Sequence, residues 1–154
     1  KGMEYNFDHS FLCMPIDSFF NYEFGELPYR SIIFEEKEEF SKDFESPVLN
    51  FTDTSRYTRK TQWNLFPNSG KSPNEIKTIT YEMPCSIEEN PKEYYYPVQT
   101  SKSKKIYQKY KKLAKDYKNI TFCGRTGLFK YIDMIPAVTI HQKIANQFLK
   151  SILI

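Results

Sequence analysis

The stretch "FCGRTGLFKYIDM", Phe122 to Met134, contains the change from strand to helix that best indicates the fold. It begins at the end of an apolar run, Asn119–Cys123, which predicts a short strand. It leads into helical spacing over about Asp133–Leu153. Pro136 suits the first turn of that helix, because its missing N–H would be unpaired there anyway. The expected buried stripe of the helix is Ala137, Ile140, Ile144, Phe148 and Ile152.

A second amphipathic helix is expected just before this strand, over about Ser103–Tyr117. Its apolar stripe comprises Ile106, Tyr110, Leu113 and Tyr117. The segment Lys102–Lys118 holds eight lysines and one acid, so the net charge of +3 arises there and the rest of the chain is acidic. A solvated lysine face is favoured over a nucleic-acid surface, since no arginine–aromatic interleaving accompanies the lysines.

The preceding part of the chain alternates apolar and polar residues with the period of half-buried strands. The strand candidates are Phe11–Ile16, Tyr29–Glu35, Val48–Thr52, "RYTRKTQWNLF" (56–66) and "KTITYEM" (77–83), with the charged "EEKEEFSKDFES" (35–46) as a connection. The expected fold class is α+β: an antiparallel β-sheet followed by helix-strand-helix. The expected regions are a ragged end at 1–13, an antiparallel sheet region at 14–98, and a C-terminal helix-strand-helix at 99–154.

Several classes of protein are excluded by what the sequence lacks. It has no apolar run of about 20 residues and no signal-peptide pattern, so we expect no membrane span and a cytoplasmic location. The cysteines Cys13, Cys85 and Cys123 are far apart, which favours buried thiols over a disulfide or zinc site. No dinucleotide-binding or Walker glycine motif occurs, and no protein nucleophile stands out. Any chemistry would therefore be carried by a cofactor.

The glycine–arginine step in the opening stretch has two interpretations. A strand end, Gly124, Arg125 and a nearby helix N-terminus can form an anion site from N–H groups and a guanidinium. Alternatively, Gly124 and Gly127 only make a turn and Arg125 pairs with a surface carboxylate. The stretch alone leaves both open.

Four segments together resemble a known family. They are "MPIDSFFNYEFGELPYRSIIFE", "VLNFTDTSRYTR", "EYYYPV" with the lysine-rich helix after it, and "ITFCGRTGLFKYIDM". In this order and spacing they are similar to the C-terminal part of bacterial UDP-galactopyranose mutase, from about Met14 onward. The resemblance implies a flavoenzyme that interconverts UDP-galactopyranose and UDP-galactofuranose for cell-surface polysaccharide (lipopolysaccharide, O-antigen) biosynthesis. The reduced flavin carries the chemistry in that family, so no catalytic side chain is expected.

The resemblance also implies roles for individual residues. The substrate-binding positions are Arg30, Arg59, Tyr95, Tyr96, Tyr131 and Asp133, and the cofactor-binding positions are Gly124, Arg125 and Met134. The planar, permanently charged guanidinium of Arg59 suits the diphosphate of the substrate. Contacts from Lys60 to Phe66 are not implied, because this chain departs from the family's pattern there.

The family's glycine-rich FAD-binding unit is not among these residues. The chain is therefore expected to be part of a larger α/β FAD-dependent flavoprotein, inactive and without bound FAD by itself. Exposed apolar surface would then favour self-association into a homo-oligomer. Two alternatives remain open: a non-catalytic module that binds nucleotide sugars or glycans, and a nucleic-acid binder that uses the lysine-rich helix.

Overall fold

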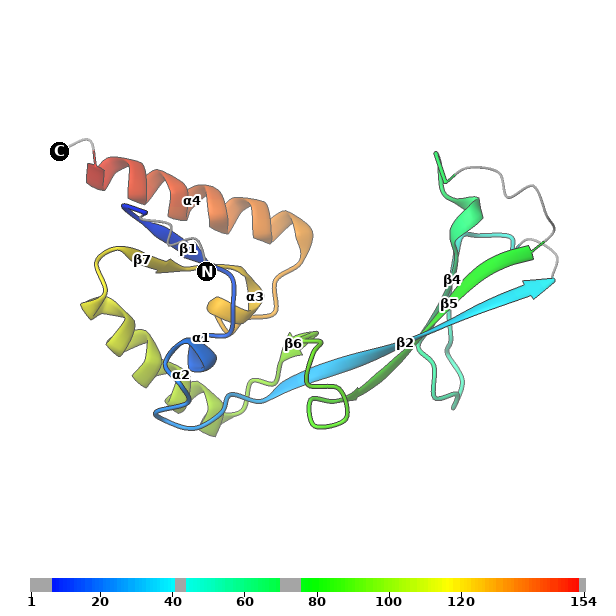
Figure 1. Cartoon of the computed structure of the whole chain (residues 1–154), viewed down its shortest axis with the longest axis horizontal. Coiled ribbons are helices and arrows are strands. Elements are labelled where there is room, and N and C mark those ends of the chain that lie inside the picture. The colour runs from blue at the N-terminus through cyan, green and yellow to red at the C-terminus, as the bar shows by residue number, and fades with distance from the viewer. Residues whose placement is uncertain (1–6, 41–43, 70–75, 153–154) are drawn as a thin grey trace, which may run out of the picture. The chain divides into compact units, whose positions relative to one another are not determined.

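The computed structural model describes residues 7–40, 44–69 and 76–152, and the chain forms two compact units (Figure 1). The first unit is built from both ends of the chain, up to Tyr29 and from Tyr96 onward, and the second comprises Arg30–Tyr95. The expected sheet region 14–98 thus has residues in both units. At the level of class, the α+β prediction is confirmed.

The first unit contains a two-stranded parallel sheet. Its strands are β1 (Ser10–Leu12) and β7 (Ile120–Phe122), paired from Ser10 with Ile120 to Leu12 with Phe122. The helices of the unit are α1 (Ile16–Phe19), α2 (Ser101–Leu113), α3 (Gly124–Gly127) and α4 (Met134–Ile152). Within this unit α4 runs along one side of the two strands, while α1 and α2 lie on the other (Figure 1).

The start of the chain differs from expectation in two respects. The strand expected over Phe11–Ile16 ends at Leu12, and Ile16–Phe19 are helical. Strand β1 also lies within residues 1–13, the expected ragged end, of which 1–6 are outside the described residues. The segment from Asp17 to Leu27 folds back on itself instead of extending as a strand, because the Asp17 carboxylate accepts the N–H of Leu27 at 2.7 Å.

Helix α2 begins and packs as its sequence suggests, but ends earlier. Thr100 and Ser103 form a capping box, in which each side chain hydrogen-bonds the backbone N–H of the other. Tyr110 is fully buried; its hydroxyl accepts from the N–H of Phe24 and donates to the carbonyl of Gly25. Tyr117 is 42% exposed, because a 3-10 turn replaces the α-helix after Leu113.

Helix α4 has apolar residues on two sides. Of the expected stripe, Ala137, Ile140, Ile144 and Phe148 are half-buried, whereas Ile152 is 59% exposed, contrary to the prediction. Further large apolar side chains are exposed on this helix: Met134, Ile135, Val138 and Leu149. The described part of the first unit therefore does not cover all of its apolar surface.

The second unit is an antiparallel sheet in the order β3-β4-β5-β2. The strands are β2 (Tyr29–Phe40, whose Tyr29 belongs to the first unit), β3 (Val48–Asn50), β4 (Arg59–Gln62) and β5 (Ile76–Ser86), with a 3-10 turn at Trp63–Leu65. The short β6 (Tyr96–Pro97) follows this unit along the chain. Trp63 Nε1 donates to the Thr80 hydroxyl at 2.7 Å, so the indole is fixed to β5.

Strand β2 is longer than expected. It continues to Phe40, through charged residues that were predicted to form a connection. Glu35, Lys37 and Glu39 alternate along it and therefore project from one face. All three are partnered there by side chains from elsewhere in the unit, and this partnering favours the strand.

Candidate functional site

The predicted site residues belong to both units. Arg30, Arg59 and Tyr95 lie in the second unit, and Tyr96, Gly124, Arg125, Tyr131, Asp133 and Met134 lie in the first. The geometry of each set follows from its own unit.

Arg30 and Arg59 project from the same face of the second unit's sheet. Phe34 on β2 pairs with Glu82 on β5, which pairs with Arg59 on β4, so these three side chains share a face. Arg30 is four residues before Phe34 on the same strand and shares that face as well. The strand rise and spacing put the Cα atoms of the two arginines roughly 16 Å apart, so an extended ligand, rather than one phosphate, can bridge them.

The guanidinium of Arg59 is held loosely at the surface. Its Nη1 is 3.5 Å from the carboxylate of Glu82, and its Nε donates to the side-chain oxygen of Asn50 at 3.1 Å. The Arg59 side chain is 43% exposed. Ion pairs of this length and exposure contribute little to stability, so a diphosphate can compete for the guanidinium.

Tyr95 is positioned by its backbone beside Arg30. Its N–H donates to the Arg30 carbonyl at 2.9 Å, which fixes the end of the 87–95 connection to the first residues of β2. Ser31, which is fully buried, donates to the carbonyls of Asn90 and Glu93 and holds the same connection. The placement of Tyr95 near an arginine therefore depends on well-bonded backbone.

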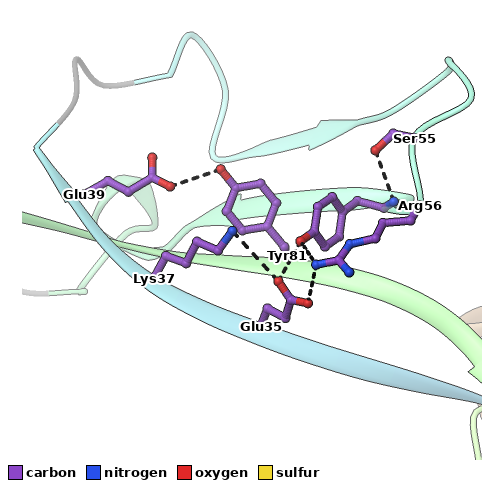
Figure 2. Close-up of polar contacts among 7 residues, drawn as sticks. Glu35, Lys37, Glu39, Ser55, Arg56 and Tyr81 are labelled. Atoms are coloured by element: carbon purple, nitrogen blue, oxygen red, sulfur yellow. Dashed lines mark hydrogen bonds and ion pairs between the residues drawn. The ribbon is translucent and has the colours of Figure 1, made fainter. Parts of the chain in front are cut away.

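The opposite face of this sheet carries a cluster of charged and aromatic side chains (Figure 2). The carboxylate of Glu35 accepts from the Tyr57 hydroxyl at 2.6 Å and from Arg56 Nη2 at 2.7 Å. The Tyr57 hydrogen bond, with the charges of Arg56 and Lys37, lowers the pKa of Glu35 below its usual value. Arg56 and Tyr57 directly precede β4, so these bonds anchor the segment that leads to Arg59.

Aromatic rings complete this cluster. Tyr81 packs between Tyr57 and Phe51, with ring centroids 5.0 and 6.5 Å away. Lys37 Nζ lies 4.8 Å from the centre of the Tyr81 ring, and the Tyr81 hydroxyl donates to Glu39 at 3.3 Å. Because these rings and charged groups pack against and hydrogen-bond one another, they hold the β3–β4 connection against the sheet. We call this cluster the Glu35 clamp.

In the first unit, three predicted residues come together. The guanidinium carbon of Arg125 is 5.1 Å from the centre of the Tyr131 ring, and that ring meets Tyr96 edge-on at 5.9 Å. Arg125 Nε also donates to the Ile132 carbonyl at 2.8 Å. Tyr131 is 55% exposed, so this stack presents an accessible aromatic and cationic surface.

The backbone of the glycine–arginine step is not arranged as an open anion site. The N–H of Gly124 donates to Nε2 of His141 at 2.8 Å. The other ring nitrogen of His141 then carries the proton and donates to the Ala137 carbonyl at 2.6 Å. Helix α3 is only four residues long, and Gly124 has φ +73°. Of the two interpretations, the tight turn describes Gly124, while the guanidinium of Arg125 still faces an exposed ring.

Asp133 and Met134 lie at the start of α4. The carbonyl of Asp133 accepts the N–H of Ala137 at 2.8 Å and so begins the helix. The side chain of Asp133 is exposed, and Met134 is 86% exposed. Both side chains are therefore accessible, and both follow Tyr131 closely in the sequence.

One pair of residues in this region was not predicted. The sulfur atoms of Cys13 and Cys123 are 3.3 Å apart, and Cys13 is exposed, contrary to the expectation of buried thiols for all three cysteines. Cys85 and Cys123 are buried as expected. The two thiols are 110 positions apart, and their contact depends on the pairing of β1 with β7. No local pattern in the sequence signals that pairing.

The part of the chain that the structure describes contains no group of three histidine, cysteine or acidic side chains suited to a metal ion. None of its helices is long and apolar enough to span a membrane. A hollow of about 310 Å³ beside α2, lined by Tyr107, Lys111 and Phe122 among others, includes none of the predicted site residues.

Comparison with known proteins identifies relatives of nearly the whole chain. The family model for UDP-galactopyranose mutase matches residues 2–131, which include the predicted site residues up to Tyr131. A probable UDP-galactopyranose mutase of Klebsiella pneumoniae is 32% identical over 149 residues, covering 96% of this chain and 38% of that protein. A UDP-galactopyranose mutase of Mycoplasma genitalium is 33% identical over 142 residues, covering 89% and 35%.

A further relative has a different name. A dTDP-fucopyranose mutase of Escherichia coli is 31% identical over 147 residues, covering 94% of this chain and 38% of that protein. The chain thus spans less than two fifths of the length of these curated relatives.

Proposed function

Because the chain belongs to the UDP-galactopyranose mutase family, we propose that it supplies substrate-binding residues to an enzyme that interconverts UDP-galactopyranose and UDP-galactofuranose. The observation that best supports this is the shared sheet face of Arg30 and Arg59, with Arg59 loosely paired at the surface. Two cations on one face suit an extended dianionic ligand such as a nucleoside diphosphate sugar.

Each unit has its own part in this proposal. In the second unit, Arg59 binds the diphosphate, and Arg30 and Tyr95 bind the remainder of the substrate. In the first unit, Tyr96, Tyr131 and Asp133 add hydroxyl donors, an acceptor and a ring surface for the sugar and phosphate. The work of these residues is to bind and orient the ligand.

We propose FAD as the cofactor of the working enzyme, since the family resemblance implies that a reduced flavin carries the chemistry. The residues present fit one edge of such a group: a guanidinium lying on an exposed ring, and the exposed thioether of Met134, suit contact with a flat ring system. Gly124 contributes by its turn, not its N–H. The bound, reduced flavin would supply the nucleophile, and the chain's own residues would hold the substrate against it.

We also propose that the first unit is part of a larger α/β sheet. A parallel pair of three-residue strands is marginal alone, and parallel sheets are normally covered by helices on both faces. The exposed apolar side of α4 is consistent with additional polypeptide packing there, which the greater length of the relatives can provide. Self-association of the chain stays a prediction.

A dTDP-sugar is the second candidate substrate, because one relative is named for dTDP-fucopyranose. It shares with UDP-galactose the diphosphate that Arg59 would bind, and differs in base and sugar. The two candidates therefore differ in specificity at the same site.

The test is conversion of UDP-galactopyranose to the furanose form by the complete gene product, with Arg59→Ala compared with Lys60→Ala. Lys60 is the neighbouring cation on β4 and projects from the opposite sheet face, so both variants lose one positive charge. We expect Arg59→Ala to raise KM at least about tenfold, a loss of about 1.4 kcal/mol, and Lys60→Ala to change it less than about twofold.

Equal effects of the two variants would contradict the role of Arg59. Absence of conversion of UDP-galactopyranose, with conversion of dTDP-fucopyranose, would select the second candidate. Conversion of neither would overturn the proposed activity.

A further inference from the structure

The contact between Cys13 and Cys123 follows directly from the parallel pairing of β1 and β7. The last paired residues are Leu12 and Phe122, and each is followed by a cysteine. Neighbouring strands are about 4.8 Å apart, which is within the Cα range that a disulfide spans. The two sulfurs are already 3.3 Å apart, so bond formation requires closure by only about 1.3 Å.

The surroundings make room for this pair. A Cβ built on Gly124 would lie 3.3 Å from both Cβ and Sγ of Cys13, so a larger residue would crowd the thiol. On the other side, the N–H of Cys123 donates to the Leu12 carbonyl at 2.8 Å, which fixes the backbone at the strand end. The Thr126 hydroxyl donates to the Cys13 carbonyl and holds that residue against α3.

The two thiols differ in accessibility. Cys13 is exposed, while Cys123 is 6% exposed, and burial together with the neighbouring thiol raises the pKa of Cys123 to about 12. Cys123 is therefore protonated at neutral pH, and Cys13 is the sulfur that an oxidant in solution reaches first.

We propose that Cys13 and Cys123 are a site of reversible oxidation, at which hydrogen peroxide converts the two thiols to a disulfide. The Cys13 thiolate attacks one peroxide oxygen, the O–O bond breaks, and Cys13 sulfenic acid forms with release of hydroxide, which takes up a proton to become water. The Cys123 sulfur then attacks the Cys13 sulfur, the S–O bond breaks, and the thiol proton leaves with the hydroxide as a second water. The two thiols lose two electrons, and the peroxide gains them.

The disulfide would lock the turn that begins at Gly124. It would join the residue before Gly124 covalently to the end of β1, 110 positions away in the sequence. The Arg125–Tyr131 stack follows within the same connection, so oxidation would act on the segment proposed to contact the cofactor.

The experiment is thiol mapping of the complete gene product after brief treatment with hydrogen peroxide, followed by alkylation, digestion and mass spectrometry. We expect one linked peptide pair containing Cys13 and Cys123, with Cys85 alkylated, and reversal by dithiothreitol. Cys85, which belongs to the second unit, supplies the matched control: Cys85→Ser keeps the crosslink, and Cys13→Ser and Cys123→Ser each abolish it. Because the fold holds the thiols together, crosslinking should slow at least about tenfold in concentrated urea.

Links involving Cys85 at similar yield, or overoxidation of Cys13 to a sulfinic acid without a crosslink, would overturn the proposal. An equal rate with and without urea would also contradict it. The absence of a Cys13–Cys123 link after peroxide would likewise overturn the inference.

Discussion

Asp17 combines burial with an incompletely satisfied carboxylate. It is 3% exposed; Oδ2 accepts the Leu27 N–H, while Oδ1 has no hydrogen-bond partner in the described structure. Burial raises the pKa of Asp17 above its usual value, although the hydrogen bond from Leu27 opposes the shift. The folded chain therefore favours the protonated carboxyl, and its contribution to stability is present below the unfolded pKa and is lost as pH rises through the raised value.

This gives a prediction for two substitutions. Asp17→Asn keeps an oxygen for the Leu27 N–H and removes the buried charge, so it should raise the urea midpoint at pH 7, and the gain should disappear at acid pH. Asp17→Ala removes the acceptor and should cost about 1–3 kcal/mol. Urea unfolding of the three proteins at pH 7 and at acid pH checks both outcomes, and an Asn variant less stable than Asp at pH 7 would show that the charge is stabilising.

Individual residues differ in how well the sequence predicts them. Arg59 and Tyr131 could be selected from the sequence only through the family resemblance, and both are exposed enough to bind a ligand. Cys13 could not be placed, since its environment is determined by a strand that enters 110 residues later. The partner of the Gly124 N–H was missed for a similar reason: His141 reaches it from the second turn of α4.

At the scale of elements, the Glu35 clamp explains how a short strand, β4, is held in place. Strand β4 has four residues, and the connection before it depends on side-chain contacts of Arg56 and Tyr57 with Glu35 on β2. The lowered pKa of Glu35 means that its contribution to stability is present at neutral pH and is lost as pH falls through that lowered value.

We predict that Glu35→Gln lowers the urea midpoint at pH 7 and that the difference from the unmodified chain vanishes at strongly acid pH, where Glu35 is protonated in both states. Glu38→Gln is the matched control, because Glu38 is an exposed acid on the same strand and the opposite face. Unfolding curves at several pH values give the measurement. A difference that persists unchanged at acid pH would assign the effect to packing instead of charge.

The existence and type of the longer elements could be predicted from period and capping residues. Apolar periodicity in the sequence indicates the two long helices, observed at 101–113 and 134–152, and the strands of the second unit. Their limits were harder to predict. Strand β2 extends to Phe40 because Arg56 and Tyr57, just before β4, and Tyr81 on β5 hydrogen-bond or pack against its charged groups. Helix α2 stops at Leu113, where a 3-10 turn follows.

In the whole molecule, the second unit is inserted in the sequence between the two segments that form the first unit. The first unit closes only when residues after Tyr96 return to β1, and this long-range parallel pairing has no local signature. The α+β class was accessible from the sequence, because the run of strands precedes the helices. The division at Tyr29 and Tyr96 was not, because it depends on which strands pair.

We propose that this chain works as the substrate-binding part of a longer flavoenzyme of the UDP-galactopyranose mutase family. The measurement that tests it most directly is the intact mass and visible absorption spectrum of the gene product purified from its own source. We predict a yellow protein larger than 18.4 kDa whose flavin absorbance is lost on reduction. A colourless protein of 18.4 kDa would contradict it and would indicate a stand-alone module that binds nucleotide sugars without converting them.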